Sequence, residues 1–183
     1  MPFAVENYGP VVAEVYDENR LQPLGPGQPN QAMKARLAAL TADRLFQGKV
    51  RDPQMASLCL AALWLLHDFL DDSHKICQEV ETPSGSYWHA IMHRREPDAS
   101  NSKYWFRRVG HHPVLAEVGQ AARKLAGEHS DVQADCLRSS SWDPFAFVDL
   151  CDGARPGSDV DQLCRLVQHA EWQLLFDYCY QHG

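Results

Sequence analysis

The sequence predicts an all-α fold, a single compact multi-helix domain, and three observations support this. Apolar residues recur at steps of three and four along most of the chain, as on the buried faces of helices. Capping residues and prolines stand at the starts of several of these segments. Apart from one short strand-like piece at residues 11–15, no strand pattern competes, and no repeat of solenoid length is visible.

The first 30 residues differ from the rest because prolines and glycines are concentrated there. Both residue types disfavour long regular elements, so we expect an extended N-terminal arm over residues 1–30 that packs on the domain. The all-α domain itself is then expected over residues 31–183. A chain of 183 residues is long enough to bury one substantial core.

The central element of the predicted domain is a long helix from Pro53 to about Gln78. Asp52 is a good cap, and proline is well tolerated at the first helical position that follows it. Residues 58–66 are apolar on all sides, which is typical of a helix that is buried all round. The other predicted helices span residues 31–46, 84–96, 102–109, 113–126, 145–151 and 158–180.

Composition narrows the classes of function. The net charge is −7, which argues against a general nucleic-acid binder. The longest apolar run, residues 58–66, is too short to span a bilayer, and the N-terminus lacks the basic start and apolar run of a secretory signal. The six cysteines contain no Cys-x-x-Cys pair, so we expect reduced, buried thiols and a cytoplasmic protein.

The most informative feature of the sequence is a polar spacing that occurs twice, with offsets of 0, 4 and 7 residues. Such offsets place side chains on one face of a helix, so each set forms a stripe. The residues between the stripes predict a short turn, and an antiparallel pairing would bring the two stripes together along one seam. The first set is His67, Asp71 and His74, and the second is His89, His93 and Glu96.

A buried seam of this composition has two explanations. Imidazoles and carboxylates are the usual ligands of zinc and of non-haem iron or manganese, so all six residues are candidate metal ligands. The alternative is a hydrogen-bonded network in which carboxylates hold imidazoles without an ion. If the seam is catalytic, Asp71 or Glu96 would act as a ligand or a general base.

A second cluster overlaps the seam. Residues 89–112 contain five basic and only two acidic residues, so this segment is a basic island in an acidic chain. Aromatic residues beside arginines are typical of a site for a planar or sugar-like ligand with an anionic group. The alternative is that the aromatics are core residues and the arginines pair with acids. The candidate ligand-binding residues are Tyr87, Trp88, Arg94, Arg95, Lys103, Tyr104, Arg107, Arg108, His111 and His112.

Together these patterns lead to two hypotheses about function. The first is a metal-dependent hydrolase, or a related enzyme, that acts on a small anionic substrate at the helical hairpin. The second is a non-catalytic helical protein that binds a small anion or a partner through the same segment. No serine-nucleophile motif, phosphate-binding glycine loop or dinucleotide-binding motif is present.

Overall fold

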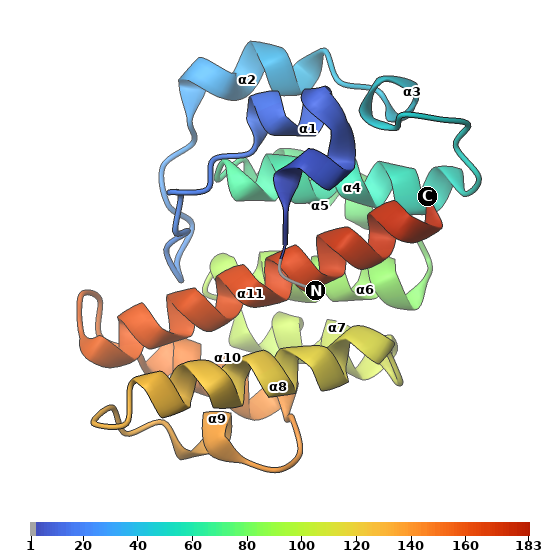
Figure 1. The fold of residues 1–183 in the computed structure, drawn as a ribbon. Helices are drawn as coiled ribbons and strands as arrows, with labels where there is room; N and C mark the ends of the chain where they lie inside the picture. Colours follow the sequence, from blue (N-terminus) through green and yellow to red (C-terminus); the bar gives the residue numbers. More distant parts are fainter. Residues whose placement is uncertain (1–2) are drawn as a thin grey trace.

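The computed structural model describes residues 3–183, which form helices joined by loops (Figure 1). No strand occurs in this part of the chain, so the predicted all-α class is confirmed. None of the helices in it is long and apolar enough to cross a membrane. The elements in order are η1 (Val5–Tyr8), α1 (Gly9–Val15), α2 (Gln31–Ala38), α3 (Ala42–Leu45), α4 (Pro53–Leu66), α5 (Leu70–Cys77), α6 (Pro83–Arg95), α7 (Ala99–Val109), α8 (Pro113–Glu128), α9 (Asp135–Arg138), α10 (Pro144–Gly153) and α11 (Asp159–His182).

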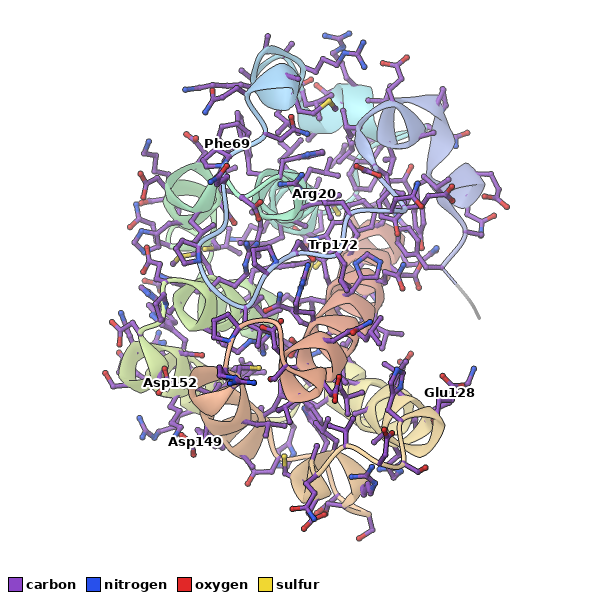
Figure 2. All side chains as sticks on the ribbon, turned by 90° about the vertical axis from the view of Figure 1, so that its left-hand side faces the viewer. Arg20, Phe69, Glu128, Asp149, Asp152 and Trp172 are labelled. Carbon is purple, nitrogen blue, oxygen red and sulfur yellow. The ribbon has the colours of Figure 1, made fainter. Side chains whose placement is uncertain are left out.

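Helix α4 is buried along most of its length, as its apolar sequence predicts. It begins as expected, with Asp52 Oδ1 accepting the backbone N–H of Gln54 at 2.8 Å. The long helix α11 crosses it, and Trp172 on α11 donates its indole N–H to the Ala62 carbonyl at 2.9 Å. Figure 2 shows Trp172 inside the molecule, where its large apolar ring joins the main core.

Helix α6 is the second central element, because every one of its residues from Ser84 to Arg95 is buried. Thr82 caps it by accepting the Gly85 N–H at 3.1 Å. Gly85 also allows the backbone of Val80, in the preceding turn, to approach the start of α6 closely. A Cβ at position 85 would lie 2.0 Å from the Val80 carbonyl oxygen. The turn between α5 and α6 is therefore tight, and it holds the two helices together as a hairpin.

The prediction of one continuous helix over residues 53–78 is wrong, because the chain breaks between α4 and α5. Asp68 adopts a left-handed conformation at the break, with φ of 64°. Its buried carboxylate forms ion pairs with Arg20 and, at 2.5 Å, with Arg95. These arginines also donate to the carbonyls of Leu65 and Leu66 in the last turn of α4, where the helix ends.

The N-terminal segment is less extended than its proline content predicts. Residues 5–15 form η1 and α1, so the expected strand-like piece at residues 11–15 is helical instead. Tyr8, Val12 and Val15 join the core, and their burial stabilises the two short helices of residues 5–15. Residues 16–30 contain no helix or strand and lie over the domain. The expected helix over residues 31–46 is divided into α2 and α3, and α9 was not predicted.

Candidate functional site

Three histidines meet on the α5–α6 hairpin. The ring centroids of His74 and His89 are 4.6 Å apart, as the predicted antiparallel pairing requires. His93, one helical turn beyond His89 on α6, lies 5.3 Å from His74 and 4.8 Å from His89 by the same measure. One ring nitrogen of each histidine falls within 4.8 Å of the other two. The structure therefore brings half of the predicted ligand set to one point, which we call the histidine cluster.

His89 is the least satisfied member of the histidine cluster. Its side chain is 3% exposed, and neither ring nitrogen has a hydrogen-bond partner. One face of the ring stacks on Trp105 of α7, with centroids 3.8 Å apart. Burial, followed by the neighbouring His93 and His74, lowers the pKa of His89 to about 3. A neutral imidazole with a free lone pair is the form that binds a metal ion.

His93 is held by two polar side chains. Its Nδ1 lies 2.8 Å from Glu96 Oε2, and the Asn101 amide nitrogen lies 3.2 Å from its Nε2. A carboxylate only accepts hydrogen bonds, so Nδ1–H donates to Glu96, and the Nε2 lone pair accepts the Asn101 amide N–H, a contact that a metal ion would have to replace. Burial lowers the pKa of His93, and Glu96 opposes this in part. A carboxylate on the far nitrogen of an imidazole is the usual outer partner of a metal-bound histidine.

The histidine cluster fits a transition-metal ion in donor type and nearly in size. Nitrogen ligands at 2.0–2.1 Å from a tetrahedral zinc ion lie about 3.4 Å apart, so the present spacing requires a contraction of at most about 1.4 Å. Small movements of the side chains and of the hairpin would have to supply this contraction. Nitrogen-only ligands favour zinc over manganese, which prefers oxygen. Three ligands also leave a fourth position open.

Two of the predicted ligands do not reach the cluster. His67 ends α4, where its Nε2 binds the Val15 carbonyl at 2.6 Å and its Nδ1 lies 3.3 Å from the Asn30 amide nitrogen. Asp71 is exposed at the start of α5 and belongs to no ligand group in the described chain. The break at Asp68 is the cause, because it interrupts the helical spacing that was expected to align these residues with His74.

Arg94 does not form part of an open anion site, contrary to the sequence prediction. Its guanidinium is buried and lies 2.6 Å from the Glu171 carboxylate, which also accepts the Tyr87 hydroxyl at 3.0 Å. The same guanidinium lies over the Phe147 ring, with Cζ 4.7 Å from the centroid. The Glu171 carboxylate keeps the pKa of Arg94 raised although burial opposes it. This arginine is therefore part of the core, where its charge is balanced internally.

Arg95 also has its binding partners inside the protein. It is fully buried, pairs with Asp68, and donates to the carbonyls of Gly25 and Leu65. Burial lowers the pKa of Arg95, and Asp68 counteracts this effect. Trp88 is likewise a core residue, with its indole N–H 3.4 Å from Cys179 Sγ. With Tyr87, these buried residues cannot line a surface site.

The remaining candidates lie on or just after α7, the helix whose Trp105 stacks on His89. Tyr104 is 48% exposed, and Arg107 and Arg108 are exposed as well. Arg108 lies over the Trp105 ring, with Cζ 5.3 Å from the centroid. Lys103 forms an ion pair with Asp149. An anion bound near the cluster would therefore meet Arg108 rather than Arg94 or Arg95.

The loop before α8 contains the last two candidates, His111 and His112. His111 is exposed. His112 is buried, and its Nε2 lies 3.0 Å from the Ser84 hydroxyl, as in a nucleophile–base pair. However, its Nδ1 accepts the Val114 N–H at 3.3 Å, so Nε2 carries the proton and donates it to Ser84. This tautomer cannot take a proton from the serine, and the pair is structural.

Comparison with known proteins finds no matching family model, no matching curated sequence and no matching solved structure. The functional argument therefore rests on the geometry of the site. Asn101 is a close partner of the cluster that the sequence interpretation did not single out. Its position eight residues after His93, beyond a proline turn, gives no periodic signal because the two residues lie on different helices.

Proposed function

We propose that His74, His89 and His93 hold a divalent transition-metal ion, with zinc the best match. The observation that carries this proposal is His89, whose two ring nitrogens are buried without partners beside two other imidazoles. Burying an unpaired polar group costs about 1–3 kcal/mol, and coordination of one nitrogen would recover much of that cost. A hydrogen-bonded network would instead provide partners for the ring. Iron is the second choice and manganese the third, because all three ligands are nitrogens.

We further propose that the site is that of a metal-dependent hydrolase acting on a small anionic substrate. An ion with three histidine ligands supplies a Lewis acid and lowers the pKa of a bound water toward neutrality. Glu96 orients His93 through Nδ1, which is the role of an outer carboxylate partner of a metal-bound histidine. Arg108, next to the ring that stacks on His89, supplies positive charge for the anion. Asp71 has no role in this version of the site.

A non-catalytic alternative is favoured by one observation. Among the large hydrophobic residues of the described chain, Tyr104 is the most exposed. Arg107 and Arg108 follow it by three and four residues on α7, so all three lie on the same side of the helix. An exposed aromatic ring beside two exposed guanidinium groups is a suitable surface for an anion or a protein partner. In this case the metal would stabilise the hairpin without taking part in a reaction.

The test compares untagged wild-type protein with two alanine variants. His89→Ala removes a proposed ligand, and His111→Ala removes an exposed histidine outside the cluster. We expect one zinc per chain, and zinc-dependent hydrolysis of the anionic substrate p-nitrophenyl phosphate, in the wild type and in His111→Ala, and neither in His89→Ala. Stoichiometric zinc without hydrolysis would favour the alternative. Absence of zinc in all three proteins after incubation would overturn both versions.

A further inference from the structure

A groove lies on the side of the molecule formed by α8, α11 and the N-terminal segment, away from the histidine cluster. Its volume is about 730 Å³. Helix α11 forms the floor, and Figure 1 shows it passing between the N-terminal elements above and α8 below. Ala170 and Leu174 lie on the floor, and Ala121 and Leu125 line the α8 side. The small alanines keep the groove open because their side chains fill little of it.

The walls of the groove are fixed by contacts within the protein. Phe3 stacks on Tyr8, with ring centroids 4.8 Å apart, and both rings line the N-terminal wall. The Tyr8 hydroxyl donates to Asp177 on α11 at 2.7 Å, which ties the wall to the floor. A groove with an anchored wall is preorganised, so an occupant does not have to order it.

The length of the groove matches a helical occupant. On α8 its lining residues run from Glu117 to Glu128, and on α11 from Ala170 to Gln181. Each of these spans corresponds to about 16 Å, or three turns of helix. A helix of this length presents apolar side chains at three- and four-residue steps, and these would pack against the half-buried Leu125 and Leu174.

The charge around the groove identifies the chemistry of the occupant. Glu117, Glu128 and Asp177 line it against a single base, Lys124, which lies 4.0 Å from Glu128. Figure 2 shows Glu128 at the outer surface of α8. A second copy of this chain is a poorer occupant than a basic protein, because the chain carries a net charge of −7. A basic partner is complementary.

We propose that the α8–α11 groove binds a basic amphipathic helix of a partner protein. Leucine-like side chains on one face of that helix would fill the groove over Ala121 and Ala170. Lysines or arginines flanking that face would meet Glu117, Glu128 and Asp177. The proposal is independent of the metal site, which lies on other helices.

The test uses a labelled peptide of about 14 residues with leucines at helical spacing flanked by lysines, and fluorescence anisotropy as the measurement. Glu117→Lys/Glu128→Lys reverses two exposed charges of the groove. Glu79→Lys/Glu81→Lys makes the same change of net charge at exposed positions outside it. We expect the groove variant to bind at least about tenfold more weakly than wild type and the control less than about twofold. Equal weakening of both variants would overturn the proposal.

Two further measurements separate recognition of a helix from binding by charge alone. Ala121→Phe fills the groove without changing charge, and we expect it to weaken binding while far-ultraviolet circular dichroism stays unchanged. A shuffled peptide with its leucines spread around the helix should bind poorly. If the shuffled peptide binds as tightly as the amphipathic one, the surface recognises charge alone and the proposal fails. Dimerisation of the wild type that is lost in Ala121→Phe would also overturn it, in favour of a second copy.

Discussion

His89 lies face to face with Trp105, with ring centroids 3.8 Å apart and planes inclined by 17°. The stack fixes the orientation of the imidazole although no hydrogen bond holds it. An aromatic residue from α7 therefore takes the place that a polar partner normally has. Both ring nitrogens of His89 therefore stay available for a metal ion. Leaving them buried without hydrogen bonds lowers the stability of the metal-free fold.

This arrangement predicts an unusual result for His89→Phe in metal-free protein. Phenylalanine keeps the stack on Trp105 and removes two unsatisfied nitrogens. We expect the free energy of unfolding to stay the same or to rise by about 1 kcal/mol, measured by urea denaturation. Zinc should stabilise the wild type and leave the variant unchanged. A marked loss of stability in the metal-free variant would instead indicate that the ring has hydrogen-bond partners.

Glu96 is predicted to tune the metal site through His93. Glu96→Gln keeps the size of the side chain but weakens the acceptor of the Nδ1–H bond. We expect zinc affinity to fall by about 10- to 100-fold, as measured by competition with a chromogenic chelator. Glu81→Gln, at an exposed position outside the site, is the control and should leave the affinity unchanged. An equal affinity in both variants would remove Glu96 from the site.

Asp68 is predicted to be among the most sensitive positions of the fold. Asp68→Asn retains the shape and tolerates the left-handed conformation, but it leaves the buried Arg95 and the partly exposed Arg20 without a countercharge. We expect a loss of about 3–5 kcal/mol in the free energy of unfolding. Asp72→Asn disrupts only a surface pair with Lys75 and should cost less than about 1 kcal/mol. Similar small effects at both positions would show that the buried ion pairs are not important for stability.

These results indicate how far the sequence could lead. The periodic spacing correctly predicted that His74 would meet His89, because a short turn and helical geometry decide that pairing locally. The same spacing failed for His67, since the break at Asp68 depends on Arg20 and Arg95, which are distant in sequence. The basic island was misleading for a similar reason. Glu171, which neutralises Arg94, is 77 residues away, and no local pattern connects the two.

The buried His112 predicts a pH dependence of stability. Burial, followed by the nearby His182, lowers its pKa in the folded state to about 4, below the 6.5 of an unperturbed imidazole. Between these values the unfolded chain binds more protons, so stability is complete above pH 6.5 and falls as the pH drops toward 4. At pH 5 the loss from this group is on the order of 2 kcal/mol.

His112→Asn provides the comparison, because asparagine can still accept the Val114 N–H at the start of α8. The variant should lose less stability than the wild type between pH 7.5 and pH 5, as measured by urea denaturation. Other histidines whose pKa values are lowered, including His67 and His169, contribute to both proteins and cancel in the difference. The same loss in both proteins would contradict the assignment to His112.

X-ray absorption at the zinc edge of zinc-loaded, untagged protein tests the central claim most directly. The histidine cluster predicts imidazole scattering from three nitrogen ligands at about 2.0–2.1 Å, and its loss in His89→Phe. The chain has six cysteines as possible competitors, and thiolate ligands would give a zinc–sulfur distance of about 2.3 Å. Three-histidine coordination would establish the metal centre. Sulfur ligation, or coordination unchanged in His89→Phe, would contradict it.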